Sequence, residues 1–469
     1  MQLSRALRLS PSQPAPNPQS GGSIAFVGAG GKTTAIFLLA RELQSQIENR
    51  KLVLSEACPE RRRRVETSAI IVTAASHLGA WQIPLADHHI VAESPEEIGE
   101  LPEGITLVTG PIEADRTQPV NSSVLSWLHE VSKNKNLPFL IEADGSRARP
   151  LKAPAAREPP IPDFVDTAIV AAGLGGLGQP LDEDHVHRPH LFSTLSGLAL
   201  NQPVTPASLV RLLTHPAGGL KNIPARARRV ALLNQAETPE LQSIGGGIAR
   251  GLLGHFDSVL VGSLQQNDFH TFERTAGILL AAGESKRFGQ PKQLLGWKGK
   301  PFARQVAETA LHAGLWPVLV VTGSNAEQVE KAVTGLDVTI VRNENWQNGQ
   351  GASIATGVRA LPKNTGASIF LLADQPQIPA EILRALVETH AQNLPAILAP
   401  LALEEKRANP VLFDRIAFPD LLQLTGDVGG RALFGKYKVE YLPWHDEALL
   451  LDVDTPEDYE RLKKLISLS

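Results

Sequence analysis

The chain has 469 residues, which is too long for one ordinary hydrophobic core and predicts two domains, three at most. Hydrophobic residues make up 42% and charged residues 20% of the sequence, values typical of globular proteins, so wholesale disorder is excluded. The 45 Lys and Arg residues against 49 Asp and Glu residues give a net charge of −4. This balance argues against nucleic acid or a membrane surface as a partner.

Cysteine content and hydropathy indicate the cellular compartment. Cys58 is the only cysteine, which excludes a disulfide framework and a CxxC-type zinc site within one chain. No apolar stretch approaches the ~18 residues that a membrane helix needs, and the first residues lack the continuous apolar segment of an export signal. We therefore expect no membrane association and a cytoplasmic location.

The first part of the chain predicts a leader followed by an α/β domain. Residues 1–22 become rich in Pro, Ser, Gln and Gly after residue 10 and are expected to be a flexible leader. In residues 23–265, short apolar runs alternate with segments of helical periodicity, which predicts a mainly parallel α/β sheet. The expected strands are 24–27, 51–54, 69–72, 105–108, 139–141, 167–171, 230–233 and 259–261.

A second α/β domain is expected over residues 275–469. The polar segment 266–274 is predicted to be a linker, with the boundary near residue 272. Beyond it the alternation of apolar runs and helical segments resumes, and the two halves are not repeats because their glycine turns differ. The expected strands of the second domain are 277–281, 317–321, 339–341, 368–372, 396–399 and 411–413.

The first glycine turn follows the strand expected at 24–27. The sequence VGAGGKTT at 27–34 leads into a helix, which is the context of a phosphate-binding P-loop. Phe26 stands where the full Walker A pattern has a glycine. In this interpretation Lys32 reaches the outer phosphates and Thr33 joins Mg²⁺. The expected nucleotide-binding residues are Gly28, Gly30, Gly31, Lys32, Thr33 and Thr34.

An acidic strand end and two further segments accompany this turn. The sequence FLIEADG at 139–145 places Glu142 and Asp144 where a Walker B acid stands, and Asp144 is a candidate metal ligand. Solvated charge at a strand end is the alternative for both acids. The histidines near residue 187 cluster with acidic residues and allow either a transition-metal site or an ordinary polar loop.

This half resembles the YqeC-like family, accessory proteins of selenium-dependent molybdenum hydroxylases. The resemblance covers 23–265 and rests on GAGGKTT at 28–34, EADGS at 142–146 with PLKAP at 150–154, and GQPLDEDHVHRP at 178–189. It implies a nucleotide-binding accessory domain and a molybdenum hydroxylase as a possible client protein. Asn-Gln-Ala-Glu at 234–237 departs from the family's Asn-Lys-x-Asp-like strand end, which weakens guanine specificity.

The second glycine turn reads LAAGESKRFGQPK at 280–292. Glycines after a strand let backbone N–H groups approach a triphosphate. Lys286, Arg287 and Lys292 add three cations that neutralise the phosphates and a leaving pyrophosphate. An accidental strand–loop–helix turn is the alternative.

The turn is similar to LAAGxSxRxGxxK, the opening motif of the MobA/MocA-like nucleotidyltransferases of molybdenum cofactor synthesis. Further family segments follow in the same order, and the resemblance covers 275–465: NENWQNGQGASI at 343–354, LLADQP at 371–376, NPVLF at 409–413, GDVGGR at 426–431 and DVDTPED at 452–458. It implies a Rossmann-like nucleotidyltransferase fold and a nucleotide site formed by Ala281, Ala282, Gly283, Ser285, Lys286, Arg287, Gly289, Lys292, Thr322 and Gly323.

Nucleotidyl transfer needs positioning and charge neutralisation rather than a protein nucleophile, because the attacking phosphate is already an anion. Lys292, Arg287 and Asp374 are the expected catalytic residues. Mg²⁺ prefers carboxylates, waters and phosphates, so Asp374 and Asp454 are its expected ligands. The alternatives are a helix N-cap for Asp374 and a helix start at Asp454.

The resemblance also implies the substrates. The Ala-Ala-Gly turn at 281–283 and the 343–354 segment are similar to the cytidylyltransferase branch, so we expect CTP, Mo-molybdopterin as acceptor and molybdopterin cytosine dinucleotide as product. The alternatives are a GTP-using guanylyltransferase, a sugar-phosphate nucleotidyltransferase and a nucleotide-regulated chaperone. Arg-Ala-Asn-Pro at 407–410 departs from the family's Gly-His-Pro, and 427–431 also fits an ordinary turn. The expected acceptor-binding residues are Asn409, Asp427, Gly429, Gly430 and Arg431.

Overall fold

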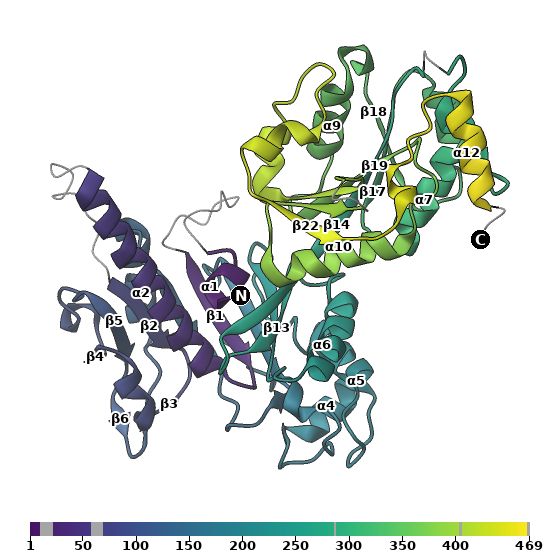
Figure 1. The fold of residues 1–469 in the computed structure, drawn as a ribbon. Helices are drawn as coiled ribbons and strands as arrows, with labels where there is room; N and C mark the ends of the chain where they lie inside the picture. Colours follow the sequence, from purple (N-terminus) through teal and green to yellow (C-terminus); the bar gives the residue numbers. More distant parts are fainter. Residues whose placement is uncertain (10–21, 58–68, 286–287, 403–405, 467–469) are drawn as a thin grey trace. The chain divides into compact units, whose positions relative to one another are not determined.

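The computed structural model describes residues 1–9, 22–57, 69–285, 288–402 and 406–466. The chain divides into two compact units, Met1–Phe272 and Glu273–Ser469, and each is a mixed α/β unit (Figure 1). The α/β class expected from the alternating apolar runs is therefore confirmed. Within the described ranges, no helix combines the length and the apolar character needed to cross a membrane.

The first unit is built on a parallel sheet. Its strands are ordered β13-β12-β10-β1-β8-β2-β5-β4, and every described register between these neighbours is parallel. The strands are β1 (Ser23–Gly28), β2 (Ala69–Ala74), β4 (His88–Val91), β5 (Gly104–Thr109), β8 (Phe139–Glu142), β10 (Thr167–Gly173), β12 (Arg228–Asn234) and β13 (Ser258–Ser263). A small three-stranded sheet consists of β3 (Leu78–Gly79), β7 (Arg116–Thr117) and β6 (Ile112–Glu113), and a two-stranded sheet of β9 (Leu151–Lys152) and β11 (Val186–His187).

Helices cover both faces of this sheet because its strands send alternate side chains to opposite faces. Phe26 packs with α2, whereas Val27 packs with α3 and α6 on the other face. The helices are α1 (Leu3–Ala6), α2 (Lys32–Ala57), α3 (Ser122–Lys135), α4 (Pro189–Ser196), α5 (Pro206–Thr214) and α6 (Pro239–Leu252). Most strands, with the exception of β4, are buried on both faces, which explains the near-continuous apolar runs of the sequence.

Two expectations for this unit differ from the structure. Residues 51–54 belong to the end of α2 rather than to a strand. The start of the expected leader is packed: Leu3 and Ala6 are buried, and the carboxylate of Glu42 accepts the backbone N–H groups of Leu3 and Ser4. Residues 10–21 lie outside the described residues.

The expected linker is also a strand. Residues 268–274 form the start of β14 (Asp268–Ala281), where exposed and buried residues alternate and Phe269 and Thr271 are buried. The segment looked like a linker because it contains many polar residues. These polar residues alternate with residues that pack on the buried face of the strand, so the two-residue period of a strand was not recognised.

The second unit has a sheet ordered β22-β20-β21-β19-β14-β17-β18. Its central strands are parallel, but β21 pairs antiparallel with both β19 and β20. The strands are β17 (Val318–Thr322), β18 (Thr339–Arg342), β19 (Thr365–Leu372), β20 (Ile397–Leu401), β21 (Val411–Asp414) and β22 (Val439–Pro443), with a hairpin of β15 (Gly296–Trp297) and β16 (Lys300–Pro301). The helices are α7 (Phe302–His312), α8 (Ala326–Ala332), α9 (Gln350–Arg359), α10 (Ala380–Asn393), α11 (Phe418–Leu421) and α12 (Pro456–Ile466).

Candidate functional site

A cleft of about 690 Å³ opens at the carboxyl ends of β14 and β19 in the second unit. In parallel α/β sheets this edge is where ligands bind, because helix N-termini and strand-end loops converge there. The cleft is lined by Leu280, Ala282, Gly283, Glu284, Ser285, Phe288, Lys292, Gln293, Trp346, Gln347, Gly349, Gln350, Ser353, Leu372, Ala373, Asp374, Asp427 and Asp454.

Lys292 joins the two acids that the sequence singled out. Its Nζ donates to Asp374 Oδ2 at 2.8 Å and to Asp454 Oδ1 at 2.7 Å. Burial lowers the pKa of Lys292, but the charge of Asp374 and the hydrogen bonds to both carboxylates outweigh burial and raise it above its ordinary value. Lys292 therefore stays a cation in the middle of an acidic strand-end cluster.

The acids are placed by neighbouring segments rather than by helix caps. Asp374 follows β19, and α10 begins only at Ala380, so the N-cap alternative is wrong. The start of α12 is capped by a contact between Thr455 and Asp458, which leaves the Asp454 side chain free to bind Lys292. Both acids thus face the cleft.

The donor set fits a hard cation. Asp374 Oδ1 is buried and has no hydrogen-bond partner among the described residues, so the structure leaves one carboxylate oxygen unmatched at this point. No group of three or more His, Cys, Asp or Glu side chains within the described ranges is placed to hold a metal ion. Two carboxylates suit Mg²⁺, which usually keeps waters and phosphate oxygens as its remaining ligands.

A third acid, which the motif analysis did not single out, lies close enough to this pair to interact with it electrostatically. Burial, and then the charges of Asp374 and Asp454, raise the pKa of Asp452. Gln375 donates to Asp452 Oδ1 at 2.6 Å. The repeated acids of the DVDTPED motif were the available signal, but the sequence could not show that Asp452 contacts Gln375, the residue directly after Asp374.

Gln293 fixes the shape of the glycine turn and was also missed. Its buried amide donates to the carbonyl oxygens of Ala281 at 3.1 Å and Gly283 at 2.6 Å. Ser285 Oγ donates to the same amide's oxygen at 3.4 Å and accepts the backbone N–H of Lys292 at 3.1 Å. One side chain therefore holds both ends of the turn, and its position directly after Lys292 was the signal in the sequence.

The predicted nucleotide-binding residues separate into three groups. Ala282, Gly283, Ser285 and Lys292 line the cleft, while Ala281 accepts from Gln293 beside it. Gly289 and Thr322 are not among its described lining residues. Gly323 is also outside the described lining, but it packs directly against two lining residues: a Cβ there would lie 2.7 Å from Trp346 Cβ and 2.9 Å from Ala282 Cβ. Lys286 and Arg287 lie outside the described residues.

Of the predicted acceptor residues, Asp427 lines the cleft. Gly349 has φ +89°, and a Cβ there would lie 2.5 Å from Asp427 Oδ1, so glycine lets this loop approach the cleft. Arg431 donates to Asn409 Oδ1 at 3.4 Å, and its charge opposes, without reversing, the rise in the pKa of Asp452. These two residues, with Gly429 and Gly430, lie outside the described lining of the cleft.

The glycine loop of the first unit connects β1 to α2. Gly28, Gly30 and Gly31 have φ of +93°, +80° and +115°, a region that strongly favours glycine. A Cβ on Gly28 would lie 2.2 Å from the Ala171 carbonyl oxygen, so the loop is also packed closely against β10. Lys32 is the first residue of α2, and its Nζ donates to the Gly28 carbonyl at 2.6 Å.

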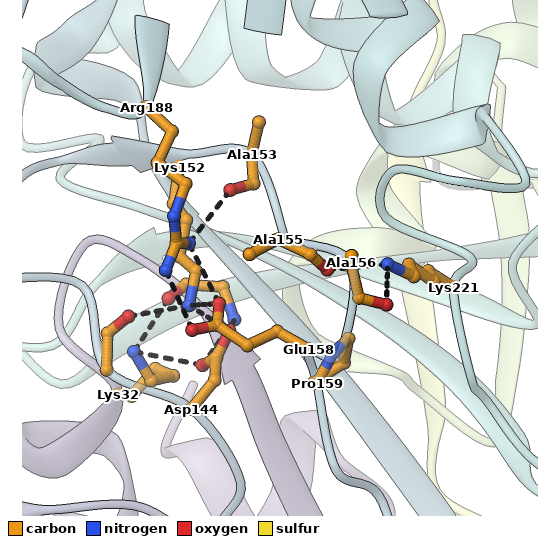
Figure 2. A network of polar contacts seen from close by, with 12 residues as sticks. Lys32, Asp144, Lys152, Ala153, Ala155, Ala156, Glu158, Pro159, Arg188 and Lys221 are labelled. Atoms are coloured by element: carbon orange, nitrogen blue, oxygen red, sulfur yellow. Dashed lines mark hydrogen bonds and ion pairs between the residues drawn. The ribbon is translucent and has the colours of Figure 1, made fainter. Parts of the chain in front are cut away.

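Asp144 organises a buried network of charges around this loop. Its carboxylate accepts the Gly28 N–H at 3.0 Å and lies 3.4 Å from Lys32 Nζ and 2.7 Å from Lys152 Nζ. Lys152 also contacts Glu158 at 2.7 Å, and Arg188 binds Glu158 with two bonds of 2.8 Å. Figure 2 shows these contacts running from Lys32 to Arg188. The alternative of solvated strand-end charge is therefore wrong for Asp144, which is buried.

Glu142 is equally buried and has a different partner. Thr33 Oγ1 donates to Glu142 Oε2 at 2.7 Å, and Gln82 Nε2 donates to Thr33 Oγ1 at 3.1 Å. Burial raises the pKa of Glu142, although Lys32 and the Thr33 hydrogen bond oppose the shift. The hydroxyl expected to join Mg²⁺ thus contacts Glu142, whereas the oxygens of Asp144 face two lysines and a backbone N–H.

The strand end at Asn234 and the histidine cluster near residue 187 have structural contacts instead of a base-recognition or metal-binding geometry. Asn234 donates to the Gly30 carbonyl at 2.7 Å and accepts the Leu264 N–H at 2.9 Å, so it holds the glycine loop in place. In the histidine cluster, Asp182 and His185 form a pair at 2.7 Å. Burial, and then the charges of Arg188 and Lys152, lower the pKa of His187 to about 4. Among the described residues of this segment, no three His, Cys, Asp or Glu side chains are placed to hold a metal ion.

These two sites, on two α/β units, define a nucleotidyltransferase-type domain preceded by a second glycine-loop domain. Family models match both parts: "MobA-like NTP transferase domain" over residues 277–456 and "YqeC protein" over residues 24–190. The chain belongs to the MobA-like NTP transferase family through its C-terminal half and carries a YqeC domain before it. Both resemblances inferred from the motifs are confirmed.

Individual relatives match one half each. "Nicotine blue oxidoreductase" of Paenarthrobacter nicotinovorans is 31% identical over 194 residues, which are 40% of this chain and 95% of that protein. "Uncharacterized protein YqeC" of Escherichia coli is 29% identical over 260 residues, 52% of this chain and 88% of that protein. "Probable molybdenum cofactor guanylyltransferase" of Bacillus mycoides is 25% identical over 203 residues, 41% of this chain and 98% of that protein.

Proposed function

We propose that the second domain transfers CMP from CTP to the phosphate of Mo-molybdopterin, giving molybdopterin cytosine dinucleotide and pyrophosphate. The observation that carries this proposal is the Lys292 ammonium between Asp374 and Asp454 in the cleft. The family membership and the relative named as a molybdenum cofactor guanylyltransferase support a nucleotidyl transfer in molybdenum cofactor maturation.

The residues of the cleft match what this reaction requires. An oxygen of the acceptor phosphate forms a bond to the α-phosphorus of the nucleotide, and the bond from that phosphorus to the pyrophosphate oxygen breaks. Lys292 neutralises phosphate charge that develops on the leaving group. The backbone of the 282–285 turn, fixed by Gln293, positions the triphosphate. Mg²⁺, when bound by Asp374 and Asp454, supplies further neutralisation of phosphate charge.

The first domain acts, in this proposal, as a nucleotide-binding accessory unit of P-loop type. Three glycines in positive-φ conformations precede Lys32 at the start of α2, an arrangement that exposes backbone N–H groups to phosphates. Its role is delivery or modification of the cofactor for a molybdenum hydroxylase client, which is the role that the YqeC resemblance implies.

Release of pyrophosphate tests the transferase proposal. The full chain with Mg²⁺, Mo-molybdopterin and CTP should release pyrophosphate, whereas GTP should not. Asp374→Asn should abolish turnover with an unchanged fold, and Asp337→Asn, at an exposed position between α8 and β18, serves as the matched control. Retained activity in Asp374→Asn contradicts the role of this carboxylate.

A guanylyltransferase is the second candidate, favoured by the printed name of the Bacillus mycoides relative. The choice of CTP depends on the Ala-Ala-Gly form of the turn at 281–283 and on the 343–354 segment. Equal or greater pyrophosphate release with GTP assigns the chain to the second candidate. Release without any pterin indicates a sugar-phosphate substrate, and no release with any nucleotide indicates a regulatory binding protein.

A further inference from the structure

Three oxygen-bearing side chains meet beside the glycine loop of the first unit. Thr33 comes from the first turn of α2, Glu142 ends β8, and Gln82 lies in the short helix η2 (Ala80–Leu85). Thr33 Oγ1 donates to Glu142 Oε2 at 2.7 Å and accepts from Gln82 Nε2 at 3.1 Å. Residues separated by 49 and 109 positions in the chain therefore converge on one hydroxyl.

The amide of Gln82 has an unmatched acceptor at this point. Gln82 Oε1 is buried and has no hydrogen-bond partner among the described residues. It is bonded to the same carbon as the Nε2 that donates to Thr33, so the amide that carries the unmatched oxygen is the one that contacts the hydroxyl. A buried acceptor without a partner is unfavourable, and native structures usually satisfy such groups with a protein donor, water or an ion.

Asp144 is not available for the same task. Its carboxylate already accepts from Gly28 and forms ion pairs with Lys32 and Lys152. Glu142, by contrast, has the Thr33 hydroxyl as its hydrogen-bond donor, and that hydroxyl would turn its lone pairs toward a cation without losing its proton. A carboxylate, a hydroxyl and an amide oxygen are all hard ligands of the kind that Mg²⁺ prefers.

We propose that Thr33, Glu142 and Gln82 provide three oxygen ligands for a divalent hard cation of the Mg²⁺ class, bound together with phosphate on the glycine loop. This inference depends on the proposed phosphate site of the first domain. It assigns the acidic ligand to Glu142 in place of Asp144, and it adds Gln82, a residue outside both glycine-loop motifs.

The position of Gln82 is fixed by the same helix that carries Thr33. Arg41 of α2 donates to the Leu85 carbonyl at 3.0 Å and forms an ion pair with Asp87 at 2.7 Å. These contacts attach the end of η2 to α2. Trp81, directly before Gln82, is 75% exposed. Its fluorescence therefore offers a local signal for occupation of the site.

The probe is the complex of Mn²⁺ with inorganic triphosphate, which requires no base recognition. Mn²⁺ is a paramagnetic quencher, and the Mg²⁺ complex is its diamagnetic control. The emission of Trp81 is obtained as the difference between the full chain and its Trp81→Phe variant, because Trp346 in the other cleft also responds to ligands. We expect saturable quenching of the Trp81 component in the wild-type background.

The variants separate the ligands from the phosphate site. Glu142→Gln and Gln82→Leu should each raise the half-saturating concentration by about 10-fold, the order of effect for a lost metal contact, whereas Gln82→Glu should retain binding. Gln202→Leu, at an exposed glutamine of the same unit, should leave the titration unchanged. Circular dichroism and melting temperatures establish that each variant is folded.

Two outcomes overturn the inference while leaving the proposed function standing. One is unchanged quenching in Gln82→Leu together with its loss in Lys32→Ala. The other is no Mn²⁺-dependent quenching in the wild type while calorimetry still shows Lys32-dependent binding of triphosphate. Absence of any Lys32-dependent heat removes the phosphate site of the first domain, and with it both this inference and the proposed nucleotide-binding role of that domain, while the transferase proposal for the second domain is unaffected.

Discussion

In the C-terminal cleft Lys292, 15% exposed, lies between Asp374 and Asp454, which are 24% and 53% exposed. In the N-terminal unit Lys152, 1% exposed, lies between Asp144 and Glu158, which are 2% and 28% exposed. The chemistry of the two clusters is the same, a lysine between two carboxylates. The surroundings differ, because Lys152 also donates to the Gly145 carbonyl and Glu158 is bound by Arg188.

This difference indicates that Lys292 can exchange its carboxylate partners for a bound phosphate, whereas Lys152 stabilises the folded structure of the first unit. The C-terminal cluster loses less when Lys292 is released to a phosphate, because Asp454 is 53% exposed and water can replace its contact with Lys292. In the N-terminal network Lys152 and Asp144 are almost completely buried, so removing either one leaves the other charge poorly solvated. We therefore expect substitutions at Lys292 to change activity and substitutions around Lys152 to change stability.

The largest expected effect is on folding. Lys152→Met leaves Asp144 and Glu158 without their shared cation and should lower the free energy of unfolding by about 3–5 kcal/mol. Urea unfolding measures this change. Lys300→Met removes the exposed partner of Glu308 and should change it by less than about 1 kcal/mol. Equal midpoints for the two variants contradict the distinction.

Lys292→Met should reverse the pattern. The rate of pyrophosphate release should fall by about 10²–10³-fold, the effect of losing one preorganised charge donor. The unfolding free energy should change by less than about 1 kcal/mol, because the two acids remain partly solvated. Lys298→Met, at an exposed position in the β15–β16 turn, is the control for activity. A stability loss as large as that of Lys152→Met disproves the contrast.

The pH dependence of stability should come from the buried network. Burial raises the pKa of Glu158, but hydrogen bonds from Arg188 and Lys152 outweigh it and lower the pKa from 4.5 to about 2. A lowered folded-state pKa stabilises the fold above pH 4.5, and this stabilisation, up to about 3 kcal/mol, is lost as the pH falls toward 2. Thermal melts of Glu158→Gln against wild type should converge at low pH. Parallel curves over this range exclude Glu158 as the source.

The smallest effect concerns the glycine turn of the cleft. Gln293→Leu removes the donors to Ala281 and Gly283 and should lower the free energy of unfolding by about 1 kcal/mol. Because the turn then loses its fixed shape, the KM for the nucleotide should rise more than kcat falls. Steady-state kinetics measure both constants, and a loss of kcat alone assigns Gln293 to the chemical step instead.

The local patterns of the sequence predicted much of the candidate site. Apolar runs ending in glycines or acids located β1, β14 and β19, and the residues that follow them line or border the two sites. The same patterns failed for residues 51–54 and 268–274. A helix end with an apolar run looks like a strand, and a strand with one polar face looks like a linker.

The sequence by itself determined the two-domain α/β plan, the family of each half and the residues at the strand ends. Tertiary structure alone decided which of those residues meet. Lys292 reaches acids 82 and 162 positions away, Gln82 reaches Thr33 across 49, and Asp144 is buried between two lysines rather than solvated. The physical reason is that periodicity and turn chemistry act over a few residues, whereas the order of strands in a sheet sets the neighbours of each strand end.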